Sequence, residues 1–308
     1  MNIIFEPINS ISQIQMQCAI GLGNFDGVHI GHAELINTLV KEARSRDLKS
    51  IVFTFNKHPE NIIRRKLITP QITTNKKKIE LMYNFDIDYL YFANFDEYFS
   101  RLHPEEFAKK ILVDRMGIKL AVVGYDYRFG FRGTGNVDLL IKLGEKYGFE
   151  VIVIPPVKIS DTIVSSTSIR KSLIHGDIQN AQEMLGRNYS IQGMVIHGKK
   201  IGNKIGFPTA NIEPEKYLII PKNGVYLTKT LVNGCMYKSI TNIGKNPTFR
   251  LEQTSVETYI IDFNEHIYGQ MIEVFFYTWI RGERKFKEIE DLKNQIKKDK
   301  ELCINTSY

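Results

Sequence analysis

The chain has 308 residues, of which 43% are hydrophobic and 24% are charged, and its formal net charge is +7. This length leaves room for two domains of ordinary size, and the composition is that of a globular protein. Its three cysteines lie far apart, which excludes a disulfide framework and a Cys-x-x-Cys motif. No apolar run approaches the ~20 residues of a membrane helix. The first ten residues, MNIIFEPINS, do not resemble a signal peptide, so we expect a cytoplasmic protein.

The basic charge balance suits an anionic partner, and nucleotides and nucleic acids both qualify. Lysines and arginines are scattered, with short runs such as residues 76–78 and 297–298. Because they form no stripe with interleaved aromatic residues, a nucleic-acid-binding protein with an added β-barrel is the less favoured alternative.

The clearest motif is GLGNFDGVHIGH, residues 21–32. The apolar run at residues 18–20 predicts the end of a buried strand, and apolar residues at helical spacing over 35–43 predict a helix. The motif is therefore expected on a turn from a strand into a helix, where ligands bind in open α/β sheets.

The residue types of this motif favour a phosphate site. Its glycines let the backbone approach a ligand closely, and the amides that begin a helix attract anions. His29 and His32 add hydrogen-bond donors. A zinc-binding His-x-x-His pair is the alternative, but no further pair of Cys or His ligands lies nearby in the sequence.

Strand and helix patterns alternate after this motif. We predict strands over 49–55, 87–92, 120–123 and 150–154, and helices over 75–84, 105–116 and 136–147. This alternation predicts a doubly wound parallel sheet.

Three further segments accompany this sheet. Residues 56–59 (NKHP) and 124–130 (GYDYRFG) each follow a predicted strand. Residues 164–170 (VSSTSIR) place hydroxyl groups before a helix and an arginine one turn later, which indicates a second anion site or a simple helix cap.

The pattern changes after Gly186. Short β-type runs are predicted at 191–196, 224–228, 237–240, 256–262 and 272–279, with a final helix over 285–298. Such runs, separated by Gly, Asn and Pro, predict a compact antiparallel β-barrel. We place the boundary near Arg187, which gives domains over 1–186 and 187–308.

The segment GKKIGNKIGFPTAN, residues 198–211, lies within the predicted barrel. It is not a Walker phosphate loop, although its glycines and lysines are able to wrap a triphosphate. Thr209 and Asn211 offer oxygen ligands that suit Mg²⁺. A basic hairpin tip is the simpler alternative.

These motifs resemble those of the prokaryotic bifunctional riboflavin kinase/FAD synthetases, in which the FAD synthetase activity is that of an FMN adenylyltransferase. GNFDGVHIGH resembles the His-x-Gly-His signature of nucleotidylyltransferases, whose histidines stabilise the ATP phosphates. Residues 164–170 resemble the family's Ser-Ser-Thr-x-Ile-Arg motif, and residues 206–211 (GFPTAN) resemble the end of its riboflavin kinase motif. Further similarities run through the barrel to Arg281 and residues 285–286, so the resemblance covers nearly the whole chain.

The resemblance implies two ATP-dependent activities. The barrel would phosphorylate riboflavin to FMN with MgATP, and the N-terminal nucleotidylyltransferase domain would adenylylate FMN to FAD and release pyrophosphate. The catalytic residues implied are His29, His32 and Arg170 in the first domain and Glu257, as the base, in the second. The implied nucleotide- and flavin-binding residues are Gly23, Asn24, Phe25, Asp26, His58, Gly124, Asp126, Ser166, Thr167, Gly198, Lys204, Gly206 and Arg281. Thr209 and Asn211 would hold Mg²⁺.

Three positions depart from the family's pattern. Lys57 replaces a proline, Asn203 replaces an arginine common in the kinase motif, and Tyr259 stands where a histidine is frequent. These departures motivate an alternative, a monofunctional FMN adenylyltransferase with a catalytically silent flavin-binding barrel.

Overall fold

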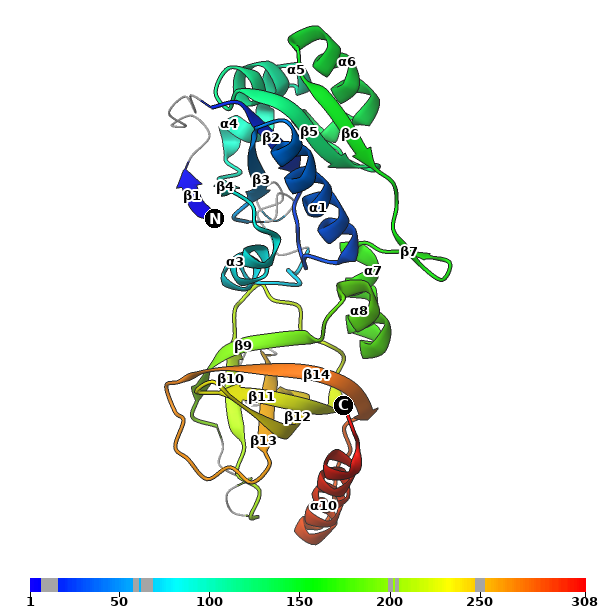
Figure 1. The fold of residues 1–308 in the computed structure, drawn as a ribbon. Coiled ribbons are helices and arrows are strands. Elements are labelled where there is room, and N and C mark those ends of the chain that lie inside the picture. The colour runs from blue at the N-terminus through cyan, green and yellow to red at the C-terminus, as the bar shows by residue number, and fades with distance from the viewer. Residues whose placement is uncertain (7–15, 58–60, 62–68, 199–201, 203–204, 247–252) are drawn as a thin grey trace. The chain divides into compact units, whose positions relative to one another are not determined.

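The computed structural model describes residues 1–6, 16–57, 61, 69–198, 202, 205–246 and 253–308. These residues form two compact units, Met1–Ser166 and Thr167–Tyr308 (Figure 1). His58, Asn203 and Lys204 lie outside the described residues.

The first unit contains a six-stranded sheet in which every pair of neighbouring strands is parallel. Its strands are β1 (Asn2–Glu6), β2 (Cys18–Leu22), β3 (Lys49–Phe55), β4 (Tyr89–Ala93), β5 (Ile118–Gly124) and β6 (Glu150–Ile154). Their order is β1-β4-β3-β2-β5-β6. Because the chain moves outward from β2 in both directions, the carboxyl end of β2 is a topological switch point, where ligands bind in such sheets.

Helices cover both faces of this sheet. They are α1 (Ile30–Ser45), α3 (Asn75–Met82), α4 (Glu97–Arg101), α5 (Pro104–Glu106) and α6 (Val137–Tyr147), with the 3₁₀ turns η2 (Tyr83–Phe85) and η4 (Phe131–Gly133) and the π-helical segment η3 (Phe107–Val113). A small hairpin, β7 (Lys158–Ile159) and β8 (Thr162–Ile163), follows β6. Leu35 and Leu39 of α1 pack in one hydrophobic core, and Phe107 and Leu140 pack in another. The predicted doubly wound sheet is therefore confirmed.

The second unit is a closed barrel in which all neighbouring strands are antiparallel. Its strands are β9 (Tyr189–Ile196), β10 (Ala210–Pro214), β11 (Gly224–Val232), β12 (Cys235–Asn246), β13 (Gln253–Ile260) and β14 (Met271–Arg281), in the order β10-β13-β12-β11-β14-β9. The predicted barrel is confirmed, although β10 was not predicted as a strand.

Three helices flank the barrel strands in the sequence. Helix α7 (Ser166–His175) begins at the last residue of the first unit, and α8 (Ile178–Leu185) follows it. Gln182 of α8 donates to the carbonyl oxygen of Phe276 in β14 at 2.8 Å, so α8 packs on the barrel although it precedes the expected boundary at Arg187.

The terminal helix is present but displaced from its predicted range of 285–298. Helix α10 spans Ile289–Asn305. Its last turns are held on the barrel because the buried Cys303 packs with Val225, Leu227 and Ile240. The prediction was wrong in its bounds because it used one apolar stripe and omitted this contact.

Five completely buried hydroxyl side chains form a continuous hydrogen-bonded chain inside the barrel. Its links are Thr230 to Ser239 (2.8 Å), Ser239 to Thr228 (2.8 Å), Thr228 to Thr241 (2.9 Å) and Thr241 to Thr258 (2.9 Å). The chain crosses β11, β12 and β13. Each of these buried polar groups therefore has a partner, as burial requires.

Candidate active sites

Residues 23–32, where the sequence predicts a phosphate site, form a loop that leaves β2 at the switch point and leads into α1. We call this segment the phosphate-binding loop after that prediction. Its backbone is left-handed at three residues: Phe25 (φ 46°), Gly27 (φ 85°) and Val28 (φ 40°). Positive φ is an outlier for a β-branched residue such as Val28, and strained backbone of this kind persists only where its surroundings hold it in place.

Asp26 is one of the groups that hold the loop. It is 4% exposed, and its Oδ1 accepts hydrogen bonds from the amides of Ile72 (2.9 Å) and Thr73 (3.2 Å). The amide of Gly27 donates to Thr73 Oγ1 at 3.1 Å. Asp26 was expected to bind nucleotide. In the structure its carboxylate fastens the loop to residues 72–73, and direct contact with a ligand stays a prediction.

His29 and His32 meet at the start of α1. His29 is the N-cap residue, and its Nδ1 accepts the amide proton of His32 at 3.2 Å. The two rings stack with centroids 3.5 Å apart, and the His32 ring lies 5.1 Å from that of Phe25. Because Nδ1 of His29 accepts a hydrogen bond, the neutral imidazole carries its proton on Nε2. That nitrogen is therefore a hydrogen-bond donor. The pair therefore suits an anionic ligand.

Other predicted residues of the first unit gather at the same edge of the sheet. Gly124 ends β5, and a Cβ at this glycine would lie 3.3 Å from Asp126 Oδ1. Asp126 is exposed. The partial burial of Tyr125 raises the pKa of its hydroxyl group, and the negative charge of Asp126 raises it further. Ser166 Oγ donates to the carbonyl oxygen of Asp26 at 2.9 Å, which joins the start of α7 to the loop. Thr167 and Arg170 follow on the same helix but belong to the second unit, so their part in this site stays a prediction.

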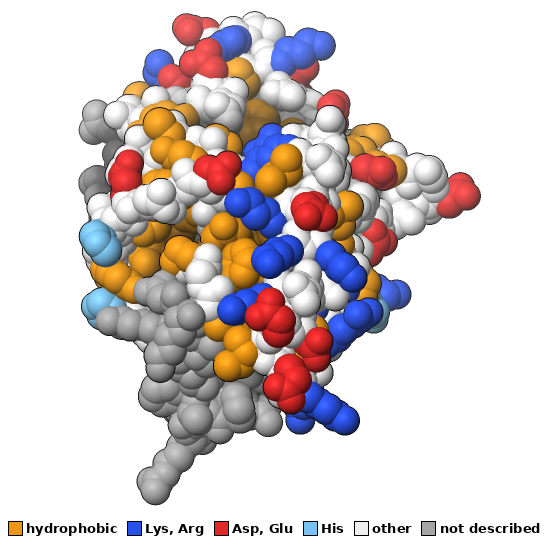
Figure 2. Space-filling view, turned by 90° about the horizontal axis from the view of Figure 1, so that it is seen from below, with side chains coloured by type: hydrophobic (Ala, Val, Ile, Leu, Met, Phe, Trp, Pro, Cys, Tyr) orange, Lys and Arg blue, Asp and Glu red, His pale blue; other side chains and the backbone are white. Residues whose placement is uncertain are grey.

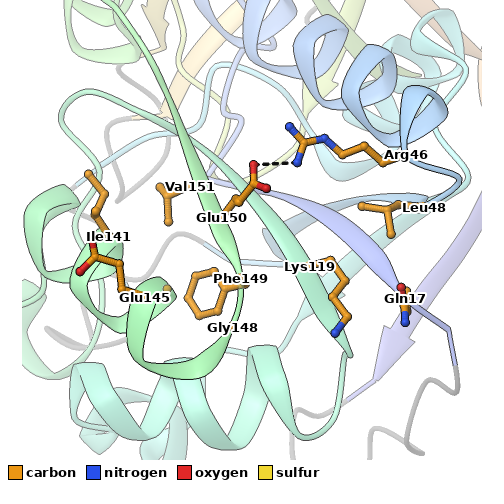
Figure 3. A pocket seen from close by; sticks show the side chains of 11 residues that line it. Gln17, Arg46, Leu48, Lys119, Ile141, Glu145, Gly148, Phe149, Glu150 and Val151 are labelled. Atoms are coloured by element: carbon orange, nitrogen blue, oxygen red, sulfur yellow. Dashed lines mark hydrogen bonds and ion pairs between the residues drawn. The ribbon is translucent and has the colours of Figure 1, made fainter.

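A pocket of about 650 Å³ lies at the opposite, amino edge of the sheet (Figure 3). Gln17 and Leu48 precede β2 and β3, and Phe149 precedes β6. Arg46 and Glu150 form an ion pair of 2.7 Å beside it. No predicted site residue lines this pocket, so it is separate from the phosphate-binding loop.

In the barrel, Asn211, Glu257 and Asn242 lie in register on β10, β13 and β12. The neighbours of Glu257, Val256 and Thr258, are buried at 1% and 0% exposure. Side chains alternate along a strand, so Glu257 faces outward, where it is half-buried. The three side chains therefore form a polar row on the outer face of the barrel. Asn242 was not among the predicted site residues.

Two described glycines of the segment 198–211 lie close to the proposed magnesium ligands. A Cβ at Gly198 would lie 2.1 Å from Asn211 Nδ2, and a Cβ at Gly202 would lie 3.3 Å from Thr209 Oγ1. Gly206 has a left-handed backbone (φ 86°). A side chain at position 198 would therefore displace the Asn211 amide.

Two predicted positions have structural partners. Arg281 binds Asp299 of α10, with 2.7 Å between Nη2 and Oδ2 and side-chain exposures of 15% and 6%. This ion pair fixes α10 to β14, and nucleotide binding by Arg281 stays a prediction. The Tyr259 ring packs edge-on against Phe207 at 5.5 Å, so it helps to hold the GFPTAN segment in place.

A histidine pair at the switch point of a parallel sheet, and a carboxylate between two amides on a β-barrel, define a two-domain transferase that uses nucleotides. Residues 11–168 match the FAD synthetase family model, and residues 185–306 match the riboflavin kinase family model. The chain belongs to the bifunctional riboflavin kinase/FMN adenylyltransferase family.

Relatives with this description match along almost the entire chain. The protein of Buchnera aphidicola subsp. Schizaphis graminum is 37% identical, with 97% of each chain covered. That of Bacillus subtilis strain 168 is 38% identical, with 98% of this chain and 96% of the relative covered. That of Escherichia coli K12 is 32% identical, with 96% and 95% covered.

A crystal structure from Streptococcus pneumoniae, described as a macrolide-efflux protein, matches the whole of both chains with a TM-score of 0.90 and 31% identity. That description concerns transport, whereas both family models and the relatives named above agree on flavin-modifying enzymes. No helix within the described residues is long and apolar enough to cross a membrane.

Both catalytic domains are present, so the bifunctional prediction is confirmed over the monofunctional alternative. The nucleic-acid-binding alternative has no support from these comparisons. On the face shown in Figure 2, basic side chains lie among acidic and hydrophobic ones.

Proposed function

We propose that the phosphate-binding loop and the start of α7 carry out the adenylylation of FMN. An oxygen of the FMN phosphate attacks the α-phosphorus of ATP, and the bond to the bridging oxygen breaks, so that pyrophosphate leaves with the electron pair. His29, His32 and Arg170 stabilise the negative charge that develops on the phosphates. Ser166, Thr167 and the backbone of Gly23, Asn24 and Phe25 position the nucleotide, and Gly124 and Asp126 lie beside it. The single observation that carries this proposal is the pair of stacked rings, His29 and His32, at the helix start, where the His32 amide donates to His29 Nδ1.

For the barrel, we propose that Glu257 accepts the proton of the riboflavin 5′-hydroxyl. That oxygen bonds to the γ-phosphorus of ATP, and ADP leaves with the electrons of the broken bond. The proposal is supported by the register of Glu257 between Asn211 and Asn242. Gly198, Lys204 and Gly206 are proposed to surround the triphosphate.

Thr209 and Asn211 fit a magnesium ion bound together with ATP. They offer a hydroxyl and an amide oxygen, which are the hard ligands that Mg²⁺ prefers. A Cβ at Gly198 would overlap the Asn211 amide and one at Gly202 would crowd the Thr209 hydroxyl, so glycine at both positions leaves these two oxygen ligands in place. When bound, Mg²⁺ would neutralise charge on the ATP phosphates.

We also propose a cytoplasmic location and a functional boundary near Arg187. The location is supported by the three free cysteines. The boundary is supported by the family-model matches, which end at residue 168 and resume at residue 185.

The assignment of both sites is tested by chromatography of flavins after the purified protein is incubated with ATP and Mg²⁺. One reaction contains riboflavin and a second contains FMN. We expect FMN and then FAD in the first, and FAD in the second. Replacement of both His29 and His32 by alanine should abolish FAD formation and spare FMN formation. Continued FAD synthesis by that variant would show that the loop is wrongly assigned.

A further inference from the structure

A buried lysine contacts the phosphate-binding loop and is not among the residues proposed to bind the substrates. Lys78 of α3 is 4% exposed. Its Nζ donates to the carbonyl oxygen of Asn24 at 2.8 Å and to Thr54 Oγ1 at 3.2 Å, and it lies 5.8 Å from the centre of the Phe92 ring. Both hydrogen-bond acceptors are neutral. A lysine is almost never buried to this extent without a specific reason.

The Asn24 carbonyl group anchors the start of the loop. It accepts a second hydrogen bond from Thr54 Oγ1 at 2.8 Å, so two side chains from outside the loop converge on one oxygen. The next residue, Phe25, is the first of the left-handed residues. Asp26 and Gly27 are held separately by Ile72 and Thr73. Hydrogen bonds therefore hold the strained segment at both ends. Lys78 and Thr54 donate the two that hold its start, at Asn24.

The charge of Lys78 adds to the effect of its hydrogen bonds. Burial lowers the pKa of Lys78 to about 8, and the attraction of Asp26 opposes this shift, so the ammonium form predominates at neutral pH. An ammonium group donates a stronger hydrogen bond than a neutral group. In a buried setting its charge also favours anions gathered nearby, without reorganisation during the reaction.

We propose that Lys78 is a positioning residue for FMN adenylylation, which holds the Asn24 carbonyl so that the loop keeps the conformation that receives the ATP phosphates. This role rests on the assignment of the loop to those phosphates. Lys78 acts through the backbone of the loop and does not itself touch the reacting atoms.

The test compares Lys78→Met with Lys76→Met. Methionine keeps a long unbranched side chain and removes the charge and the donors. Lys76 lies on the same helix at an exposed position, so the control makes the same chemical change away from the loop. Riboflavin phosphorylation by the barrel of the same molecules measures the amount of intact protein.

We expect Lys78→Met to lower kcat for FMN adenylylation by about 30- to 100-fold, the scale on which small misplacements of reacting groups act. The KM for FMN, riboflavin phosphorylation and the thermal unfolding temperature should stay close to those of the unaltered protein. Lys76→Met should change none of these quantities. Thr54→Val, which removes the second donor to Asn24, should give a smaller loss of roughly 3- to 10-fold.

Two results would overturn the proposal. One is an adenylylation rate for Lys78→Met within about threefold of the unaltered protein. The other is an equal fall in both activities with a lower unfolding temperature, which would show that Lys78 serves stability in general. The loop assignment itself is checked by His29→Asn in the same assays: full activity of that variant refutes the assignment, whereas its inactivity beside an active Lys78→Met refutes only the role of Lys78.

Discussion

Asn211 lies directly opposite Glu257 across the antiparallel pair of β10 and β13. Opposite side chains on one face of such a pair have Cβ atoms about 5 Å apart, so the amide and the carboxylate are neighbours. A proposed magnesium ligand and a proposed base are therefore placed together by strand register alone.

This arrangement predicts a selective effect of Glu257→Gln. The change keeps the shape of the side chain and removes its basicity, so riboflavin phosphorylation should fall by about 10²- to 10⁴-fold. FAD formation from supplied FMN should be unchanged. Glu213→Gln, at an exposed position on the same strand as Asn211, is the control and should affect neither activity. Flavin chromatography measures both rates, and a kinase rate near normal for Glu257→Gln would exclude Glu257 as the base.

His29 caps α1 and is also proposed to bind phosphate, and two substitutions separate these roles. Asparagine is a good N-cap residue, whereas alanine is a poor one that costs about 1 kcal/mol. We expect His29→Asn and His29→Ala to lose FAD formation alike, by at least about 100-fold. Only His29→Ala should lower the unfolding temperature of the first unit. Retained activity in His29→Asn would mean that capping, and not phosphate binding, is the function of His29.

The lowered pKa of Lys78 predicts opposite effects of pH on activity and stability. As the pH rises through about 8, folded Lys78 loses its proton, so FMN adenylylation should decline. The unfolded chain keeps this proton up to the ordinary lysine pKa of about 10.4, so between these values the unfolded state binds more protons and the folded state gains stability with pH.

Rate profiles and denaturant unfolding between pH 7 and 10 measure the two trends. The charge of Asp26 attracts the ammonium group of Lys78. The contacts of Lys78 on β3 and β4, which are Thr54 and Phe92, are uncharged. Lys78→Met should lack both trends. A decline of the same size in that variant would assign the titration to another group.

The Arg281–Asp299 ion pair predicts a large stability effect confined to the barrel unit. Arg281→Met leaves a nearly buried carboxylate without its cation, which should cost about 3–5 kcal/mol. The single tryptophan of the chain, Trp279, lies on β14, so its fluorescence during urea unfolding follows the barrel. Adding Asp299→Leu should recover much of the loss, because the buried charge is then removed. Unchanged unfolding of Arg281→Met would show that the pair contributes nothing.

Where the sequence pattern was local, its predictions matched the structure closely. The strands predicted over 49–55 and 150–154 have these bounds. The motif on the turn between β2 and α1 was found because glycines and histidines at a strand end are a strong local signal.

The features that the sequence did not predict depend on tertiary contacts. Lys78 belongs to a run of three lysines that resembles a solvated surface, and only the folding of α3 against β3 and the loop buries it. The strand β10 ends in Pro214 and carries Asn211, which we interpreted from the sequence as a magnesium ligand, and this interpretation obscured its pairing with β9 and β13. The proximity of Asn242 to Glu257 follows from the register of β12 with β13, which no local sequence pattern shows.

The buried hydroxyl chain of the barrel also determines where Glu257 points. Thr258 faces inward because its hydroxyl binds Thr241, which lies directly opposite on β12. A slip of β13 by one residue would break this link and turn Glu257 toward the interior, where it would be buried among apolar and hydroxyl groups. Substitutions of the interior threonines would thus threaten the kinase reaction without touching any substrate. The hydrogen bonds of the barrel interior therefore orient Glu257 toward the outer face and also stabilise the fold.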